Sequence, residues 1–305
     1  RRRYGSLVMS RASVFAPGSI GNVGPGFDIL GLAIDGAGDT VTVELGKSGP
    51  VVVRGRDAEL IPTDPAKNAA AIAASAILKQ PFQVTIDKGL PVSGGLGGSA
   101  ASSVAGAYAA ALAAGANPSP EEIMMAALEG EMFVSGRHLD NIAPITLGGL
   151  VLSRSIDPID AIRLAVPENW SVAVITPRVR IETKQARAIL PQQWNRESWI
   201  QQMANTAALV TAFASGDGQL ARRALDDLYA EPRRSPMIPR FPEVKQAALD
   251  AGAFGCSISG SGPTIFAIVD TSTSMNCLSA MRRAMDGIES ESRIAPIARS
   301  GARRV

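Results

Sequence analysis

A glycine-rich stretch between a predicted strand and a predicted helix constrains this chain more than any other feature of its sequence. Four of the five residues at 94–98 are glycine, and helix-forming residues follow from Ser99 onward. Without Cβ atoms, backbone N–H groups can converge on a ligand, and a helix start adds a partial positive charge. The pattern predicts a cradle for an anionic group such as a phosphate. A plain flexible turn is the alternative.

Two better-known phosphate loops do not account for this stretch. Residues 95–100 match the dinucleotide pattern G-x-G-x-x-G/A only formally, since no acidic residue ends a strand about 20 positions later. The nearest, Glu121, stands at a helix start. Gly46-Lys47-Ser48 looks like the end of a P-loop, but Val41 stands where the first glycine belongs and a strand follows.

Composition narrows the class of protein. With 46% hydrophobic and 19% charged residues over 305 positions, the sequence predicts one large or two ordinary globular domains. A net charge of +2 and 5% aromatic residues argue against nucleic-acid binding. The apolar run at 104–116 is shorter than the about 20 residues of a membrane span. Two cysteines, Cys256 and Cys277, exclude a disulfide scaffold and favour a reducing compartment.

Hydrophobic periodicity predicts a mixture of strands and helices. Strands are predicted at 41–45, 51–53, 82–87, 150–152, 172–175, 265–269 and 293–298. Helices are predicted at 66–78, 99–114, 120–133, 199–215, 219–228, 242–251 and 274–285, and a capping box at 119–122 opens the third. This mixture predicts a layered α+β architecture, with a domain boundary in the unpatterned stretch 157–168.

Two further glycine-rich segments, 17–28 and 255–263, are predicted to be loops. Each alone is explained by a turn, but three such loops in one chain favour a binding site. In the first, Asn22 and Asp28 place polar side chains on a constrained backbone, as a binding loop requires.

Glu131 falls on the apolar face of the predicted helix 120–133, in phase with Met124, Ala127 and Leu128. A carboxylate there is costly unless it is paired or bound to a metal. Mg²⁺ prefers oxygen ligands, and the hydroxyl of Ser99 is a candidate second ligand. A structural ion pair with an arginine is the alternative.

His138 is the only histidine. No serine and aspartate at triad spacing accompany it, so we expect it to bind substrate or to organise its loop. Two scattered cysteines and one histidine give no cluster for zinc.

Taken together, these segments resemble the GHMP small-molecule kinases. The stretch 91–100 corresponds to their P-x-x-x-G-L-x-S-S-A loop, and 255–263 corresponds to their late glycine loop. Within this superfamily the chain is similar to the homoserine kinase family. Four segments match its motifs: Asn22–Asp28 (N-x-G-x-G-F-D), Gly136–Pro144 (G-x-H-x-D-N-x-A-P), Thr183–Arg187 (T-K-x-A-R) and Glu231–Pro239 (E-P-x-R…I-P). The resemblance covers nearly the whole chain.

The resemblance implies a two-domain fold with an active-site cleft between the domains. An N-terminal ATP-binding domain at 1–160, with α/β layers like those of a ribosomal protein, would precede a C-terminal, ferredoxin-like, substrate-binding domain at 161–305. The resemblance also implies a homodimer. A cytoplasmic location is expected, with the plastid stroma as the alternative because the sequence starts with three arginines.

The activity implied is phosphoryl transfer from ATP to L-homoserine, a step toward threonine. ATP would lie on Pro91, Val92, Ser93, Gly94, Gly95, Leu96, Gly97, Gly98, Ser99, Ala100 and Ala101, with Mg²⁺ on Ser99 and Glu131. Homoserine would contact Asn22, Asp28, His138, Thr183, Arg187, Arg234 and Gly260, and Asp140 and Asn141 are the catalytic candidates. The two arginines suit a carboxylate, and Asp28 suits an ammonium group.

Two positions depart from the wider pattern. Gly98 replaces the first serine of the S-S pair, which removes one hydroxyl from the phosphate loop. Asn141 stands where some other GHMP kinases have an aspartate that can act as base, so transfer would depend on alignment and charge stabilisation. Two rival functions stay open at this point: another GHMP kinase, acting on mevalonate or a sugar, and a non-catalytic nucleotide-binding protein.

Overall fold

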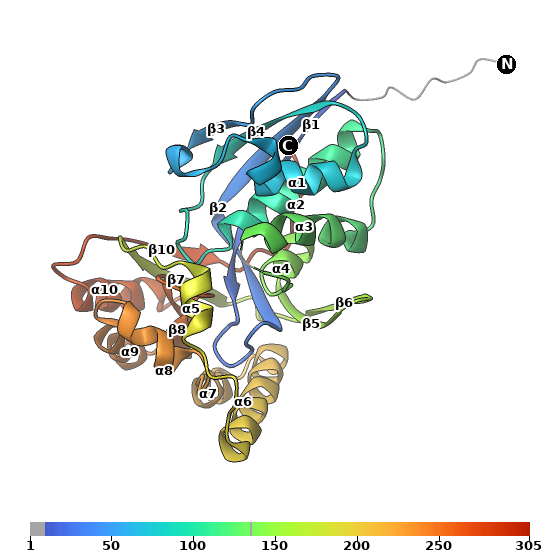
Figure 1. Cartoon of the computed structure of the whole chain (residues 1–305). Coiled ribbons are helices and arrows are strands. Elements are labelled where there is room, and N and C mark those ends of the chain that lie inside the picture. Colours follow the sequence, from blue (N-terminus) through green and yellow to red (C-terminus); the bar gives the residue numbers. More distant parts are fainter. Residues whose placement is uncertain (1–9, 135) are drawn as a thin grey trace.

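The computed structural model describes residues 10–134 and 136–305. It contains two β-sheets, one of seven strands and one of four, each with helices packed against it. Figure 1 shows the N-terminal layers in blue and green above the C-terminal layers in yellow to red. The three arginines that open the sequence lie outside the described residues.

The first sheet is built mainly from the N-terminal half. Its strands are β1 (Arg11–Gly21), β2 (Leu30–Leu45), β3 (Val52–Gly55), β4 (Phe82–Lys88), β5 (Leu150–Ile156), β6 (Ile159–Leu164) and β11 (Arg303–Arg304). The order is β11-β1-β2-β4-β3, with β5 paired to β2 and β6 paired to β5. The predicted alternation of β2 and β4 is confirmed, because Val41 lies opposite Ile86 and Val43 opposite Val84, all four buried.

Three helices lie beside this sheet: α1 (Ala69–Ile77), α2 (Gly98–Ala113) and α3 (Pro120–Val134). Helix α2 contacts β1 and β2, and α1 and α3 pack against α2 and against each other. Alanine and glycine let them approach closely, and a Cβ at Gly106 would lie 2.5 Å from the carbonyl oxygen of Ala70. The capping box before α3 is confirmed by reciprocal hydrogen bonds between Ser119 and Glu122. The short α4 (Ile142–Leu147), which the sequence did not reveal, follows α3.

The second sheet comprises β7 (Trp170–Pro177), β8 (Gly255–Ile258), β9 (Ile265–Asp270) and β10 (Ser290–Pro296), all antiparallel in the order β10-β7-β9-β8. Two helices, α9 (Phe241–Asp250) and α10 (Ser274–Ala284), pack on one face. The chain order β-α-β-β-α-β makes this half ferredoxin-like. Val172, Val174, Phe266 and Ile268 point to the other face and join the core of the first half.

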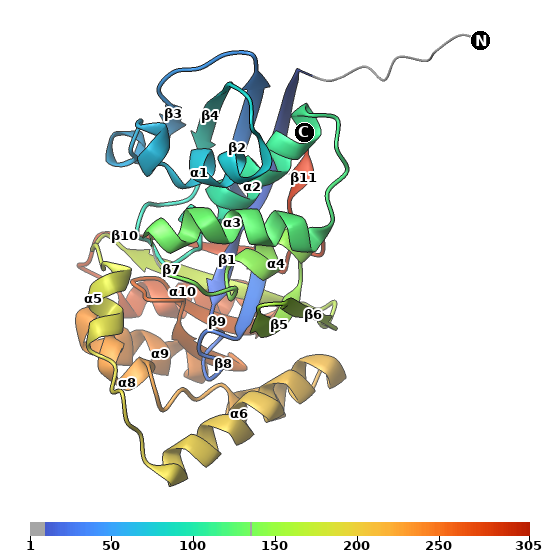
Figure 2. The ribbon, with the colours of Figure 1, turned by 45° about the vertical axis from the view of Figure 1, so that its right-hand side comes forward.

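The remaining helices connect β7 to α9. They are α5 (Thr183–Ala188), α6 (Arg196–Ser215), α7 (Gly218–Ala224) and α8 (Glu231–Arg234), with 3-10 turns at 58–60, 65–67 and 235–237 elsewhere. Figure 2 shows α6 running along the base of the molecule below β5 and β6. None of the described helices is both long and apolar enough to span a membrane.

Two predicted loops and the end of one predicted helix are corrected by the structure. Residues 17–21 are the end of β1 rather than a loop, and residues 255–258 form β8. The stretch 157–168, which looks unpatterned, contains β6 of the first sheet, so the chain passes to the second sheet between Leu164 and Trp170. The predicted helix 219–228 already ends at Ala224.

After β10 the chain returns to the first sheet. Ile297 forms a bridge with Ile34, and the amide of Ala302 donates to the carbonyl of Ile145 over 2.7 Å. The two residues of β11 then pair with Val14 and Phe15 of β1.

Candidate active site

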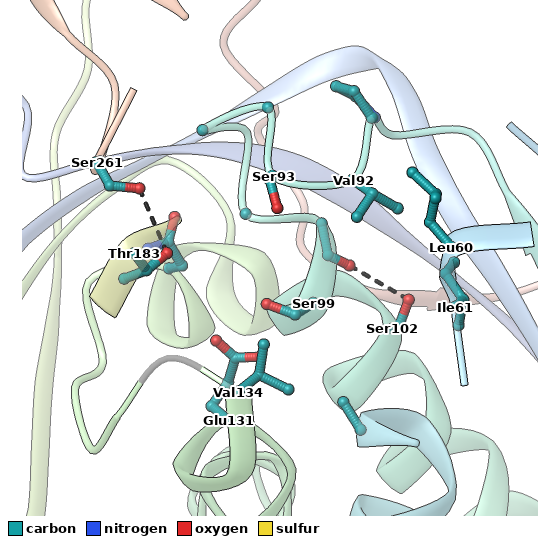
Figure 3. Close-up of a pocket in the computed structure, with 18 of the residues that line it drawn as sticks. Leu60, Ile61, Val92, Ser93, Ser99, Ser102, Glu131, Val134, Thr183 and Ser261 are labelled. Atoms are coloured by element: carbon teal, nitrogen blue, oxygen red, sulfur yellow. Dashed lines mark hydrogen bonds between the residues drawn. The ribbon is translucent and has the colours of Figure 1, made fainter. Parts of the chain in front are cut away.

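A cleft of about 420 Å³ gathers residues from both halves of the chain. The glycine stretch at 91–99 forms one wall, and Arg180, Thr183, Arg187 and Arg234 come from the other half. Figure 3 shows the stretch curving over Ser99 and Glu131, with Thr183 and Ser261 across the opening. Every residue predicted to bind homoserine or metal lines this cleft, as do both catalytic candidates.

The glycine stretch has the geometry of an N–H cradle at a helix start. Gly97 is the N-cap of α2 with φ 67°, and Gly95 also has a positive φ, of 78°. A Cβ at Gly97 would lie 2.1 Å from Ser19 Oγ, so only glycine fits there. Leu96, Ala100 and Ala101 do not line the cleft; their buried side chains hold the stretch to the core.

Residues from the second half fix the orientation of the cradle. Thr264 donates its hydroxyl to the carbonyl of Gly94, and Ser259 donates to the carbonyl of Gly95. In a trans peptide the C=O and N–H point in opposite directions. Anchoring these two carbonyls therefore turns the amides of Gly95 and Leu96 the other way. The amide of Val92 is already used, since it donates to Asp57 Oδ2 over 3.0 Å.

One buried ion pair, which sequence reasoning missed, holds both ends of the cradle. Asp39 pairs with Lys88, and its Oδ1 accepts from the amides of Gly89 and Leu90 at 3.1 Å each. Lys88 Nζ also donates to the carbonyl of Gly98 over 2.7 Å. A signal did exist, because Asp39 is in phase with Val41 and Val43, and Lys88 with Val84 and Ile86.

Glu131 and Ser99 supply oxygen atoms to one region of the cleft. Glu131 is buried on α3, and Ser99 lies in the first turn of α2 (Figure 3). A carboxylate and a hydroxyl beside a phosphate cradle are the donor set that Mg²⁺ takes when it shares ligands with a nucleotide. The residues present therefore fit that ion.

The other end of the cleft carries two arginines and a carboxylate. Arg187 donates to Asp28 from Nη1 over 2.9 Å and from Nη2 over 2.6 Å. The sequence suggested separate roles for these two residues, whereas the structure pairs them. Arg234 is 2% exposed and donates only to carbonyls, from Nε to Ala186 and from Nη1 to Gly260. In the described part of the chain no carboxylate forms a salt bridge with Arg234.

His138 and Asp140 form a second charged pair in this end of the cleft. His138 Nδ1 lies 2.6 Å from Asp140 Oδ1. Burial alone would lower the pKa of His138, but the hydrogen bond and charge of Asp140 outweigh it and raise the pKa to about 9. The imidazole is therefore cationic at neutral pH.

Three other residues of the predicted site, all of them polar, form hydrogen bonds with neighbouring residues. Asn22 Nδ2 donates to the carbonyl of Gly260 over 3.2 Å, and Asn22 Oδ1 accepts from the amide of Asp28 over 3.0 Å. Asn141 Oδ1 accepts from Ser19 Oγ over 2.8 Å. Thr183 Oγ1 lies 3.4 Å from Ser261 Oγ.

A further set of residues lines the far end of the cleft and was not predicted. It contains apolar side chains beside one amide and one ammonium group: Leu60, Ile61, Pro62, Ala69, Asn68 and Lys67. Most of them lie on the short turns before α1, which carry no periodic pattern. The cleft thus has an apolar end, a cradle in the middle and a charged end.

Comparison with known proteins agrees with this arrangement. Residues 65–149 match the N-terminal domain of the GHMP kinases, and residues 209–287 match their C-terminal domain. Galactokinase from Lactococcus lactis has the same fold, with a TM-score of 0.71 at 15% identity over 98% of this chain and 96% of its own. Fold and cleft together define a GHMP kinase.

More similar relatives narrow the class. Homoserine kinase from Chloroherpeton thalassium is 38% identical over 97% of this chain and 99% of its own, and that from Pyrococcus abyssi is 42% identical over 84% and 86%. The crystal structure of homoserine kinase from Cytophaga hutchinsonii superposes with a TM-score of 0.91 at 37% identity, covering 100% of both chains. The chain belongs to the homoserine kinase family.

Proposed function

We propose that this kinase transfers the γ-phosphoryl group of ATP to the side-chain hydroxyl of L-homoserine, giving O-phospho-L-homoserine for threonine biosynthesis. One observation carries the proposal: an N–H cradle and two clustered guanidinium groups open into the same cleft. The cradle suits a polyphosphate, and the buried Arg234, with no carboxylate partner in the described chain, suits a small carboxylate substrate.

The nucleotide would span two parts of the cleft. Its base would lie among Leu60, Ile61 and Pro62, and its phosphates on the amides that begin at Gly94. Ser99 and Glu131 would hold Mg²⁺, which would neutralise charge on the phosphate oxygens when bound. The carbonyl anchors from Ser259 and Thr264 orient the cradle before the nucleotide arrives, so little reorganisation is needed.

Homoserine would bind at the charged end. Its carboxylate would face Arg234, whose Nη2 makes no hydrogen bond to the described residues, and Arg187 beside it. Its ammonium group would approach Asp28. A zwitterion can complement both members of the Asp28–Arg187 pair at once, which an uncharged sugar or a simple anion cannot do.

The transfer itself would proceed without a strong general base. Asp140 is occupied by the cationic His138. Asn141, whose Oδ1 accepts from Ser19, is a neutral amide and would offer the reacting groups hydrogen bonds from Nδ2. The bond from the homoserine oxygen to phosphorus would form as the bond from phosphorus to the bridging oxygen of ADP breaks. With no side chain as base, the hydroxyl proton would pass to an oxygen of the transferred phosphoryl group and then to water. Alignment supplies most of the rate enhancement for such a loose transition state.

The proposed carboxylate clamp can be tested with Arg234→Leu and Arg187→Leu. Each change removes a charged hydrogen bond, worth about 1.5–3 kcal/mol, so we expect the KM for homoserine to rise by about 10- to 100-fold while the KM for ATP stays constant. A coupled ADP-release assay measures both. Unchanged homoserine kinetics in either variant would remove that arginine from the site.

The proposed Mg²⁺ ligands give a different signature. Ser99→Ala and Glu131→Ala should lower kcat and raise the Mg²⁺ concentration needed for half-maximal rate, because each loses an oxygen ligand. A titration of rate against Mg²⁺ at saturating ATP measures this. Glu129→Ala, on the same helix, is the matched control and should leave the Mg²⁺ dependence unchanged.

The rival substrates are separated by the same ADP-release assay. Activity on mevalonate or galactose but not on homoserine would overturn the proposal, and no ADP release on any alcohol would favour the non-catalytic alternative. The fold shared with Leishmania major mevalonate kinase, at 16% identity and a TM-score of 0.68, does not decide between substrates.

We also propose a homodimer located in the cytoplasm, with the plastid stroma as the alternative location. The two thiols, Cys256 and Cys277, are free and buried, which agrees with a reducing compartment. Sedimentation equilibrium would give the oligomeric state.

A further inference from the structure

Phe27 belongs to the segment Asn22–Asp28 and contacts the arginines at the charged end of the cleft, and the proposed reaction gives it no role. Its ring centroid lies 5.5 Å from the guanidinium carbon of Arg187 and 5.4 Å from that of Arg234. Both distances lie within the roughly 6 Å range in which a cation is attracted to an aromatic face. One ring therefore contacts both arginines of the proposed clamp.

The two arginines need such a group because their charges repel each other. Burial, followed by the charge of Arg187, lowers the pKa of Arg234. Arg187 has Asp28 as a counter-ion, whereas Arg234, among the described residues, donates only to carbonyl oxygens. The charges of Asp227, Asp28 and Asp140 offset part of this effect without forming a salt bridge with Arg234 in the described chain. The negative face of the Phe27 ring adds to them at closer range without placing a carboxylate against the guanidinium group. A carboxylate in that position would compete with an anionic substrate.

The ring is itself held firmly. The carbonyl of Pro25 accepts from Gln202 Nε2 over 2.9 Å and from Thr206 Oγ1 over 3.0 Å, both on α6. On the other side, Tyr229 meets the ring edge to face with 5.0 Å between centroids. The turn that carries Phe27 thus has little freedom, so the ring can fix the position of side chains that contact it.

We propose that Phe27 is a positioning residue that sets the separation and direction of Arg187 and Arg234, and thereby makes the cleft select an alcohol that bears a carboxylate. The inference rests on the proposed function, since it takes the two arginines to be the carboxylate clamp. Phe27, a side chain with no polar atom, would then determine the preference for a carboxylate-bearing substrate.

The test compares two substrates that differ only in this group, L-homoserine and L-homoserine amide. Phe27→Leu removes the π face and keeps an apolar side chain. We expect the wild type to prefer homoserine by tenfold or more, and Phe27→Leu to lower kcat/KM for homoserine by about tenfold while that for the amide and the KM for ATP change little. The ratio between substrates is independent of the fraction of folded enzyme.

Two control variants isolate the cause. Phe27→Tyr keeps an aromatic face and should retain the wild-type ratio. Phe15→Leu removes a ring that faces Arg303 at 4.5 Å, away from the cleft, and should also retain it.

The possible results distinguish the role of Phe27 from the proposed carboxylate clamp on which it depends. A wild-type enzyme that does not discriminate between acid and amide would overturn the carboxylate clamp itself. A discriminating wild type whose ratio survives in Phe27→Leu, or is lost equally in Phe27→Tyr, would overturn the role of Phe27 alone. An equal fall for both substrates would show a general structural loss and likewise contradict it.

Discussion

At the scale of single residues, the charged end of the cleft also depends on side chains that do not line it but hold those that do. Glu231 belongs to the E-P-x-R motif, yet it contacts Lys245 and accepts from Ser257 Oγ over 2.6 Å instead of facing the cleft. It ties α8 to α9 and β8 and so fixes Arg234 on the next turn. Glu231 would thus contribute to the proposed carboxylate clamp by positioning Arg234 rather than by facing the cleft.

His138 gives a prediction about pH. Its pKa in the folded protein, about 9, exceeds the ordinary value of 6.5, so protonation stabilises the fold. This contribution is complete below pH 6.5 and is lost as the pH rises through 9, on the order of 3 kcal/mol at most. Urea unfolding at pH 6 and pH 9.5 should show the loss in the wild type.

The His138→Gln variant is the control and should lack this pH-dependent loss. The chain has one histidine, so its ring signals in a proton NMR titration need no assignment. A midpoint near 6.5 in the native protein would contradict the cationic pair with Asp140.

At the scale of elements, the glycine cradle is a bridge between β4 and α2 pinned at both ends by Asp39. The carboxylate binds the amides where the chain leaves β4, and its partner Lys88 binds the first turn of α2. The flexible composition of the stretch therefore does not make it a flexible loop. Sequence alone shows the glycines but not the ion pair that holds them.

Removing that carboxylate should be costly. Asp39→Ala leaves Lys88 buried without its counter-ion, and we expect the free energy of unfolding to fall by about 3–5 kcal/mol. Ser102→Ala, which loses one hydroxyl contact to Asp39 at 2.7 Å, should cost about 1 kcal/mol. Urea titrations measure both. Asp87 is exposed on β4 next to Lys88, so Asp87→Ala is the control. Equal losses for Asp39→Ala and Asp87→Ala would contradict a special role for the buried ion pair.

The helices and strands that the sequence predicted well are the long ones with a clear hydrophobic period. Long patterned segments such as α2, α6 and β4 are found close to their predicted bounds, and the α+β class and the kinase family are confirmed. The short α4, α5 and α8 were missed because four to six residues cannot show a helical repeat. The roles of the site residues and the domain limits remain predictions.

Residues 17–21 show why a composition rule failed. Their glycines and proline indicated a loop, yet Gly18–Gly21 pair with Gly31–Ile34 of β2 as the end of β1, and Pro17 lies opposite Gly38. The need for glycine comes from a contact with a distant part of the chain, because a Cβ at Gly21 would lie 2.6 Å from Asp140 Oδ2. Glycine is needed there because the segment that carries Asp140 and Asn141 approaches the strand, and a single sequence does not reveal that contact.

At the scale of the whole molecule, one contact between the two halves passes through the cradle. Thr264, buried in the second half, donates to Gly94 of the first and also contacts Thr176 Oγ1 at 2.6 Å. A second contact between the halves is exposed rather than buried. It is the ion pair between Arg56 and Glu291, with hydrogen bonds of 2.6 and 2.7 Å. The buried contact orients a binding surface, while the exposed pair lies in water and contributes little.

Thr264→Val tests this coupling. The change keeps the shape of the side chain but leaves the Gly94 carbonyl free to rotate, so we expect the KM for ATP to rise by about fivefold, from a net hydrogen bond of about 1 kcal/mol. The rise in Tm on adding an ATP analogue should shrink as well. Arg56→Ala is the control, and a larger effect from Arg56→Ala than from Thr264→Val would reverse the assignment.

The return of residues 297–305 to the first sheet bears on how the protein is made. A growing polypeptide emerges from the ribosome in order, and β1 gains its β11 neighbour only after the entire ferredoxin-like layer has been synthesised. Until then, the outer edge of β1 offers unpaired backbone groups to any other strand. Chains that stop before residue 303 should therefore aggregate more readily than the 305-residue chain, because the edge of β1 at Val14 and Phe15 stays uncovered.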